Sequence, residues 1–234
     1  FLQFFYLPKV VLSTENITSV ARLADKYNIL DCVNTCTEVI KTQLNEDNIF
    51  WGYQLAVSLN HQGLKKICER IIELLDSEKF NSESFLKCDA LVVESILKLD
   101  SLKCSELNLF NSCVAWAKSS CRENGLDEKK PQNVKGQLAH CWNLFRFGSM
   151  SHEDIMLMLS DPFHIALFDP DELNHIFRMK SGEIFQSNIF EHKQRLQPVL
   201  YWRREDAIDC SFVNRDDGHK RYNLTERDTT RFTT

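Results

Sequence analysis

The sequence has few of the residues that build tight turns. Its 234 residues include only 7 glycines and 5 prolines. Hairpins and propeller blades need such residues, so an all-β fold is disfavoured and long helices are favoured. The chain also contains no apolar run close to the ~20 residues of a membrane-spanning helix, so a membrane is not an expected partner.

The chain has no excess of positive charge. It contains 28 Lys and Arg against 33 Asp and Glu, which gives a formal net charge of -5. Affinity for phosphate comes from clustered Lys and Arg, and none of the helices suggested by the pattern carries a basic stripe. Nucleic acid is therefore not an expected partner, and a helix-turn-helix DNA reader is the least favoured function.

Sequence patterns of catalytic and phosphate-binding sites are absent. The chain has no Gly-x-Ser-x-Gly, Gly-x-x-x-x-Gly-Lys or Gly-x-Gly-x-x-Gly. Cys32 and Cys36 have a spacing that a zinc-binding pair can use, but no second pair accompanies them and both fall on an apolar helix face. We therefore expect no enzymatic activity, no metal and no cofactor.

Cysteine is abundant. The 9 cysteines are odd in number and scattered, and most of them fall on apolar helix faces, as Cys68 and Cys113 do. Free buried thiols are typical of a reducing compartment, which favours the cytoplasm and also allows the nucleus. The chain does not begin with Met, and residues 1–7 lack the basic start of a signal peptide, so we expect a fragment of a longer protein.

Residues 12–39 show the hydrophobic pattern of two short helices. Ser13 is placed to cap the first, whose apolar face is formed by Ile17, Val20, Ala21, Ala24 and Tyr27. Asn28 interrupts this spacing. The apolar spacing then resumes at Ile29, Cys32, Val33, Cys36 and Ile40. The pattern predicts two helices that pack face to face across a tight joint.

Further helices follow at short intervals. The pattern predicts a third helix capped by Asn45 and ending near Gly63, a fourth over residues 64–75, and the clearest helix after a Ser105 cap. Trp116 lies in that helix and should be buried. More helices are predicted over residues 131–147, after Ser151 and after Asp169. Residues 1–7 read as a helix end, and the polar stretch from Arg203 onward reads as a flexible tail.

Several motifs resemble the end of a BTB (POZ) domain followed by a BACK domain. The Ala24-Asp25-Lys26-Tyr27 run is similar to the last part of BTB. The similarity to BACK is carried by Leu99-Asp100-Ser101-Leu102, Ser105-Glu106, Leu109-Phe110, Val114-x-Trp116 and Arg146-Phe147. It covers roughly residues 1–160.

The resemblance implies an all-α fold of antiparallel helix pairs. Residues 1–43 would be the C-terminal part of a BTB domain, residues 44–160 a BACK domain, and residues 161–234 a helical extension with its tail. The N-terminal two thirds of BTB, through which such domains usually dimerise, has no counterpart in the sequence. The resemblance thus implies a homodimer for the full-length protein and not for this fragment.

The function implied by the resemblance is that of a non-enzymatic adaptor between a substrate protein and a cullin-three ubiquitin ligase. In that family the cullin contacts the last BTB helices and the first helix pair of BACK. Carried onto this sequence, the contact residues are Tyr27 first, then Ile49 and Tyr53, for each of which plain core packing is the alternative. The sequence does not identify the substrate.

A different class of function also fits a chain of paired helices. An α-helical scaffold can bind partners without any role in ubiquitin transfer. True helical repeats are self-similar at a fixed period, and the segments that start at Asn45, Ser82 and Ser105 share no such similarity. The scaffold is therefore the second hypothesis, behind the adaptor.

Overall fold

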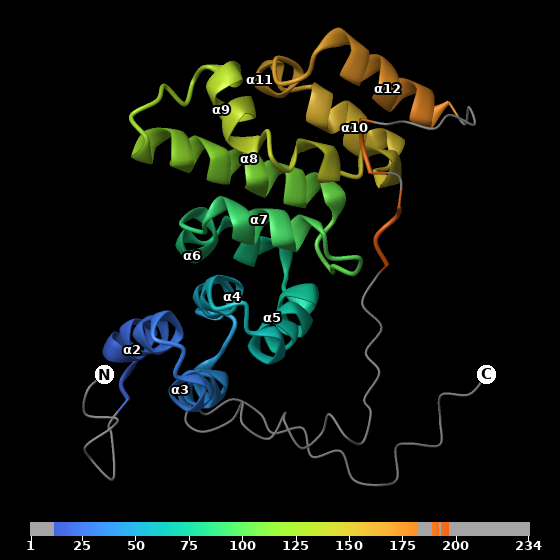
Figure 1. The fold of residues 1–234 in the computed structure, drawn as a ribbon. Coiled ribbons are helices and arrows are strands. Elements are labelled where there is room, and N and C mark those ends of the chain that lie inside the picture. The colour runs from blue at the N-terminus through green and yellow to red at the C-terminus, as the bar shows by residue number, and fades with distance from the viewer. Residues whose placement is uncertain (1–11, 182–188, 192, 197–234) are drawn as a thin grey trace, which may run out of the picture. The chain divides into compact units, whose positions relative to one another are not determined.

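The computed structural model describes residues 12–181, 189–191 and 193–196 (Figure 1). Across these ranges the regular secondary structure is helical, apart from one isolated parallel bridge between Ser101 and Leu196. The predicted all-α class is therefore confirmed. The helix end predicted at residues 1–7 and the flexible tail predicted from Arg203 lie outside the described residues.

The α-helices are α2 (Thr14–Lys26), α3 (Leu30–Gln43), α4 (Ile49–Ser58), α5 (Gln62–Leu74), α6 (Glu83–Leu86), α7 (Ala90–Leu97), α8 (Glu106–Glu123), α9 (Pro131–Leu138), α10 (His152–Leu159), α11 (Pro162–Ile165) and α12 (Pro170–Lys180). The described residues also form three short 3-10 helices, η1 (Ser77–Asn81), η2 (Trp142–Leu144) and η3 (Phe147–Ser149).

Three helix pairs are joined by the same kind of turn. After α2, α4 and α8 comes a residue with positive φ: Asn28 at 55°, Asn60 at 49° and Gly125 at 68°. The amide that follows each of them donates to the carbonyl five positions earlier, at 2.8, 3.0 and 2.8 Å respectively. This Schellman arrangement satisfies the last carbonyls of each helix and turns the chain sharply. It allows α3, α5 and α9 to pack back on the helix before them.

Successive pairs rest on one another along the chain (Figure 1). Helix α3 contacts α5, and α4 contacts both α6 and α7. Helix α8 then contacts α6, α9 and α10. The predicted packing of α2 against α3, and the general prediction of packed helix pairs, are confirmed.

The N-terminal caps are the most accurate part of the sequence-based prediction. Ser105, Ser151 and Asp169 stand at the N-caps of α8, α10 and α12. Each side chain accepts a hydrogen bond from the amide three residues later, at 3.3, 3.0 and 2.9 Å. Such bonds satisfy amides that have no partner inside the helix.

The third helix begins later than predicted. Helix α4 starts at Ile49 with Asn48 at its N-cap, whereas the side chain of Asn45 accepts hydrogen bonds from two following amides, at 2.9 and 3.1 Å. Asn45 therefore stabilises a turn that precedes the helix. Gly63 lies in the first turn of α5, because the left-handed residue that ends α4 is Asn60.

The prediction of one helix over residues 131–147 is wrong. Helix α9 ends at Leu138, and the turns η2 and η3 follow. Phe145 and Phe147 are both fully buried, at 1% and 0% exposure. Residues two apart point to different sides of a helix, so a regular helix could not bury both against the same core.

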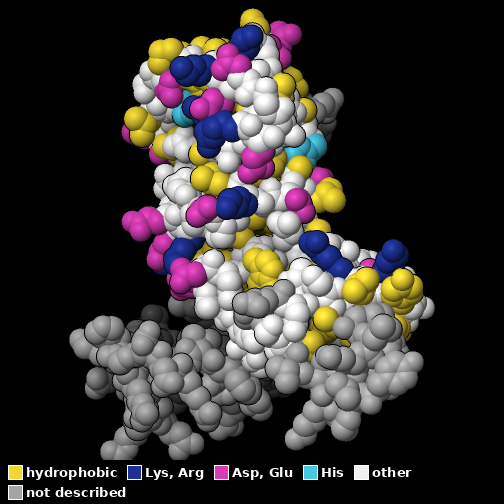
Figure 2. All heavy atoms as spheres, turned by 90° about the vertical axis from the view of Figure 1, so that its left-hand side faces the viewer, with side chains coloured by type: hydrophobic (Ala, Val, Ile, Leu, Met, Phe, Trp, Pro, Cys, Tyr) yellow, Lys and Arg dark blue, Asp and Glu magenta, His cyan; other side chains and the backbone are white. Residues whose placement is uncertain are grey.

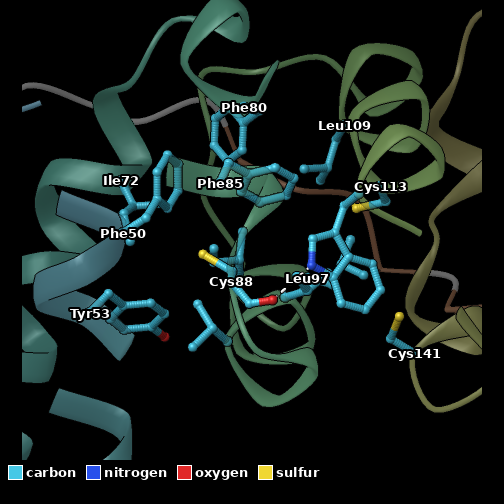
Figure 3. Packing of buried hydrophobic residues seen from close by; sticks show 14 of the residues in the cluster. Phe50, Tyr53, Ile72, Phe80, Phe85, Cys88, Leu97, Leu109, Cys113 and Cys141 are labelled. Atoms are coloured by element: carbon cyan, nitrogen blue, oxygen red, sulfur yellow. Dashed lines mark hydrogen bonds between the residues drawn. The ribbon is translucent and has the colours of Figure 1, made fainter. Parts of the chain in front are cut away.

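One aromatic cluster fills the space between α4, η1 and α6 (Figure 3). Phe50, Phe80 and Phe85 meet edge to face, with ring centroids 5.2 to 5.7 Å apart. Edge-to-face contacts add to the stabilisation from burial alone. This cluster ties the second helix pair to the segment before α7.

A second aromatic cluster packs against the buried side of α8. Phe110 contacts Phe145, Phe147 and Phe168, with centroids 5.2, 5.5 and 6.1 Å away, and Trp142 at 6.3 Å. Because Phe168 lies between α11 and α12, the packed core continues past residue 160.

Trp116 is buried as predicted, with 3% of its surface exposed. Its Nε1 donates a 2.8 Å hydrogen bond to the backbone oxygen of Cys88. Cys88 lies between α6 and α7, so this bond fixes both of those helices to α8.

Candidate partner-binding surface

Tyr27 lies at the joint between α2 and α3. It is the C-cap of α2, and 61% of its surface is exposed. The periodic pattern placed it on the buried face with Ile17 and Ala24, and that placement is wrong. The helix ends at Lys26 and the chain turns at Asn28, so Tyr27 leaves the face that the helical spacing assigned to it.

Two leucines beside Tyr27 in the sequence are exposed as well. Leu23, one turn before it, is 38% exposed, and Leu30, the first residue of α3, is 65% exposed. We call Leu23, Tyr27 and Leu30 the joint surface. Leu23 lies three residues after buried Val20, and Leu30 lies three residues before buried Val33. The apolar spacing therefore gave no signal that separates these two leucines from the buried residues.

The joint surface combines apolar side chains with a positive charge. The Nζ of Lys26 lies 5.9 Å from the centre of the Tyr27 ring. On the face shown in Figure 2, Lys and Arg are interspersed with Asp and Glu, and hydrophobic side chains lie between them. Exposed aromatic and leucine side chains next to mixed charge are typical of a protein-binding surface.

The other two predicted contact residues lie in the core. Ile49 and Tyr53 are both on α4 and are fully buried. The Tyr53 hydroxyl donates a 3.0 Å hydrogen bond to Glu69 on α5, and burial together with Glu69 raises the pKa of Tyr53 above its usual range. This burial favours the core-packing alternative for Ile49 and Tyr53, and they do not share a surface with Tyr27.

Cys32 and Cys36 face the core between α2 and α3. Both are fully buried. Burial raises the pKa of the Cys32 thiol above its usual value, and it raises the pKa of Cys36 to about 12. Metal binding and nucleophilic attack both need the thiolate. The two thiols therefore remain protonated near neutral pH and serve as small apolar groups.

The remaining cysteines follow the same pattern. All eight cysteines in the described ranges are free and buried, which confirms the expectation for those eight; Cys210 lies outside these ranges. Burial is also the main cause of the raised pKa values of Cys68, Cys88 and Cys141, each about 12. In the part of the chain that the structure describes, no three His, Cys, Asp or Glu residues are arranged to hold a metal ion.

None of the helices formed by the described residues combines the length and the apolar character needed to cross a bilayer.

Comparison with known proteins adds evidence independent of the geometry. No family model matches the chain. Over 153 residues, 65% of its length, the chain is 24% identical to BTB/POZ domain-containing protein 6-A of Danio rerio. Over the same length it is 22% identical to BTB/POZ domain-containing proteins 3 and 6 of Homo sapiens. The chain is a distant homologue of BTB/POZ domain-containing proteins.

The chain spans less than a third of the length of these BTB/POZ relatives. The matched region covers 28% of protein 6-A and of human protein 6, and 29% of human protein 3. The homology agrees with the resemblance to a BTB (POZ) domain noted in the sequence. At this coverage, the homology does not assign the activity of the complete BTB/POZ proteins to this chain.

Proposed function

We propose that this chain is part of a non-enzymatic adaptor that links a substrate protein to a cullin-three ubiquitin ligase. The observation that carries the proposal is the exposure of Tyr27 at the α2–α3 joint, the position where the BTB resemblance expects the cullin contact. The distant BTB/POZ homology supports it. The eight buried free thiols fit a reducing compartment, so we place the adaptor in the cytoplasm, with the nucleus also allowed.

The domain assignment is part of the same proposal. Residues 1–43 are the end of a BTB domain, residues 44–160 a BACK domain and residues 161–234 an extension. In this assignment α2 and α3 belong to BTB, and α4 and α5 form the first helix pair of BACK. The full-length adaptor is a homodimer whose substrate is an unassigned protein.

Tyr27 and Leu30 are suited to be the main contact residues. An aromatic ring with a polar tip gives a large apolar area at a small cost in side-chain entropy, and exposed Tyr residues often dominate interfaces. Leu30 is the most exposed of the three joint-surface residues. Ile49 and Tyr53 enter the proposal only as core residues that hold α4 against α5, since neither has exposed surface.

The test is direct binding to the N-terminal domain of cullin-three, measured by biolayer interferometry. Tyr27→Ala and Leu30→Ala should each raise Kd at least tenfold, which corresponds to about 1.4 kcal/mol per variant. Their far-ultraviolet circular dichroism should equal that of the wild type, because both side chains are exposed.

A matched control is available on α7. Leu91 is 64% exposed, against 65% for Leu30, so Leu91→Ala removes the same exposed side chain far from the α2–α3 joint in the sequence. It should leave Kd unchanged. Equal loss of binding in Leu30→Ala and Leu91→Ala would refute the joint surface as the contact.

The scaffold hypothesis makes the opposite prediction for the wild type. If the chain is a helical interaction module without a role in ubiquitin transfer, neither the chain nor the full-length protein that contains it binds cullin-three. The paired helices joined by Schellman turns suit both hypotheses, so cullin binding decides between them.

A further inference from the structure

Residues 189–191 and 193–196, here called the 189–196 segment, contact two earlier parts of the chain, the connection between α7 and α8 and the 3-10 helix η2. The Leu196 amide donates to the backbone oxygen of Asp100 at 2.7 Å, and the Glu191 amide donates to that of Asn143 at 2.8 Å. Leu196 also forms the parallel bridge with Ser101. The segment thus contacts the α7–α8 junction, residues 97–106, through one backbone hydrogen bond and one isolated bridge, and it contacts η2 through a second backbone bond.

Arg195 anchors the segment at the end of α7. It is 8% exposed, and its Nε donates to the Leu99 oxygen at 3.0 Å, while Nη2 donates to the Leu97 oxygen. Its Nη1 pairs with Glu106 in the first turn of α8. The last carbonyls of a helix lack partners within the helix and carry partial negative charge, so they suit a guanidinium group.

Lys193 makes a second charged contact with the junction. Its Nζ pairs with Asp100, which also accepts a 3.0 Å hydrogen bond from Arg146 Nη2. Lys193 and Arg146 hold the pKa of Asp100 below its usual range. Arg146 is 3% exposed and also donates to the Leu99 oxygen at 3.3 Å.

An aromatic residue fixes the other end of the segment. Phe190 is 3% exposed, and its ring meets the edge of Phe147 at a centroid distance of 4.8 Å. Phe190, Lys193 and Arg195 therefore form a pattern of one aromatic anchor followed by basic residues three and five positions later.

Without this segment the junction presents two carboxylates, Asp100 and Glu106, beside the carbonyls of Leu97 and Leu99. Asp100 is paired with the buried Arg146, whereas the junction's own lysines, Lys98 and Lys103, are paired with Glu94 and Asp76. The carboxylate and carbonyl oxygens suit the basic side chains of an extended peptide, and the Phe147 ring offers an edge-to-face contact to an aromatic residue of that peptide.

We propose that the α7–α8 junction is a docking site for an extended segment of this aromatic-and-basic pattern, and that residues 189–196 occupy it in cis. The junction is then a second protein-binding surface, closed by the chain's own segment. A partner peptide with the same pattern gains access by displacing that segment. The proposal does not depend on cullin binding.

The test uses the full chain and a fluorescein-labelled peptide of residues 188–197. Arg195→Ala removes the charged anchor and should free the junction, so the labelled peptide should bind this variant in fluorescence polarisation. Binding to the wild type should be at least tenfold weaker, because a tethered segment competes at a high effective concentration. A peptide that carries the same Arg195→Ala change should not bind either protein.

A second variant that should free the junction, here called the second opening variant, controls for a folding defect in Arg195→Ala, the first opening variant. Leu196→Pro removes the amide that donates to Asp100 but replaces a side chain that is 66% exposed. It should also admit the peptide. Arg22→Ala, at an exposed arginine of α2, is the control and should exclude the peptide as the wild type does.

Two results would overturn the proposal. If the peptide binds the wild type and both opening variants equally, residues 189–196 do not occupy the site. If it binds neither opening variant while hydrogen exchange shows the α8 amides still protected, the segment is not a separable ligand.

Discussion

Glu172 offers the sharpest test of how α12 is held. Its side chain is buried at 9% exposure, and its Oε1 accepts a 2.7 Å hydrogen bond from Trp142 Nε1. Its Oε2 accepts from Lys135 Nζ at 2.7 Å and from the Asp169 amide at 2.9 Å. One carboxylate therefore joins α9, η2 and the start of α12.

The expected cost of Glu172→Ala follows from these three contacts. Loss of the capping bond costs about 1 kcal/mol, and the unsatisfied indole N–H of Trp142 costs about 1–3 kcal/mol. The ion pair adds at most about 1 kcal/mol, because Lys135 is 31% exposed. The three contributions overlap, so we expect a loss of about 2–4 kcal/mol in the free energy of unfolding.

Glu172→Gln separates these contributions. The amide keeps one oxygen for the Trp142 indole, but its NH2 group cannot accept from the Asp169 amide or from Lys135. This variant therefore loses the capping bond and the ion pair but not the Trp142 bond, and it should cost about 1–2 kcal/mol. Urea titrations followed by circular dichroism at 222 nm measure both variants. Equal losses for Gln and Ala, or a loss below about 0.5 kcal/mol for Ala, would refute the view that the carboxylate fixes α12.

Two further changes probe the core around α8. Trp116→Ala should cost about 3–5 kcal/mol, since it opens a large cavity and removes the bond to Cys88; an unchanged melting temperature would show that Trp116 does not hold α8 in place. His164 lies 5.4 Å from the Phe110 ring, and burial lowers its pKa. The folded state therefore favours neutral His164. The contribution of the neutral side chain to the stability of the fold is present above the usual His pKa near 6.5 and is lost as the pH falls. The urea midpoint should drop from pH 7.5 to 5.5, and the drop should be smaller in His164→Gln.

Local signals in the sequence predict much of the helical architecture. Caps at Ser105, Ser151 and Asp169 depend on contacts within three residues, and the buried positions of α8 follow its own period. The α2–α3 joint was located at Asn28 because this residue interrupts the apolar spacing, and the structure shows Asn28 in the left-handed conformation that Asn tolerates.

The errors have two origins. The Tyr27 error is local, because the helical spacing was extended past the end of α2 at Lys26. The burial of Ile49 and Tyr53 depends on tertiary contacts with α5 and its Glu69. The pairing of Arg195 with Glu106 joins residues 89 apart. Neither hydrophobic period nor capping chemistry carries information about contacts across such separations.

The contacts of residues 189–196 also bear on how the chain folds. The paired helices join residues close in sequence, so they can form early, with little loss of chain entropy. The bonds of Arg195 to Leu97 and Leu99 close loops of 98 and 96 residues. During synthesis Arg195 leaves the ribosome after every helix described above. Closure over the α7–α8 junction is thus a late event, made on a surface that has already folded.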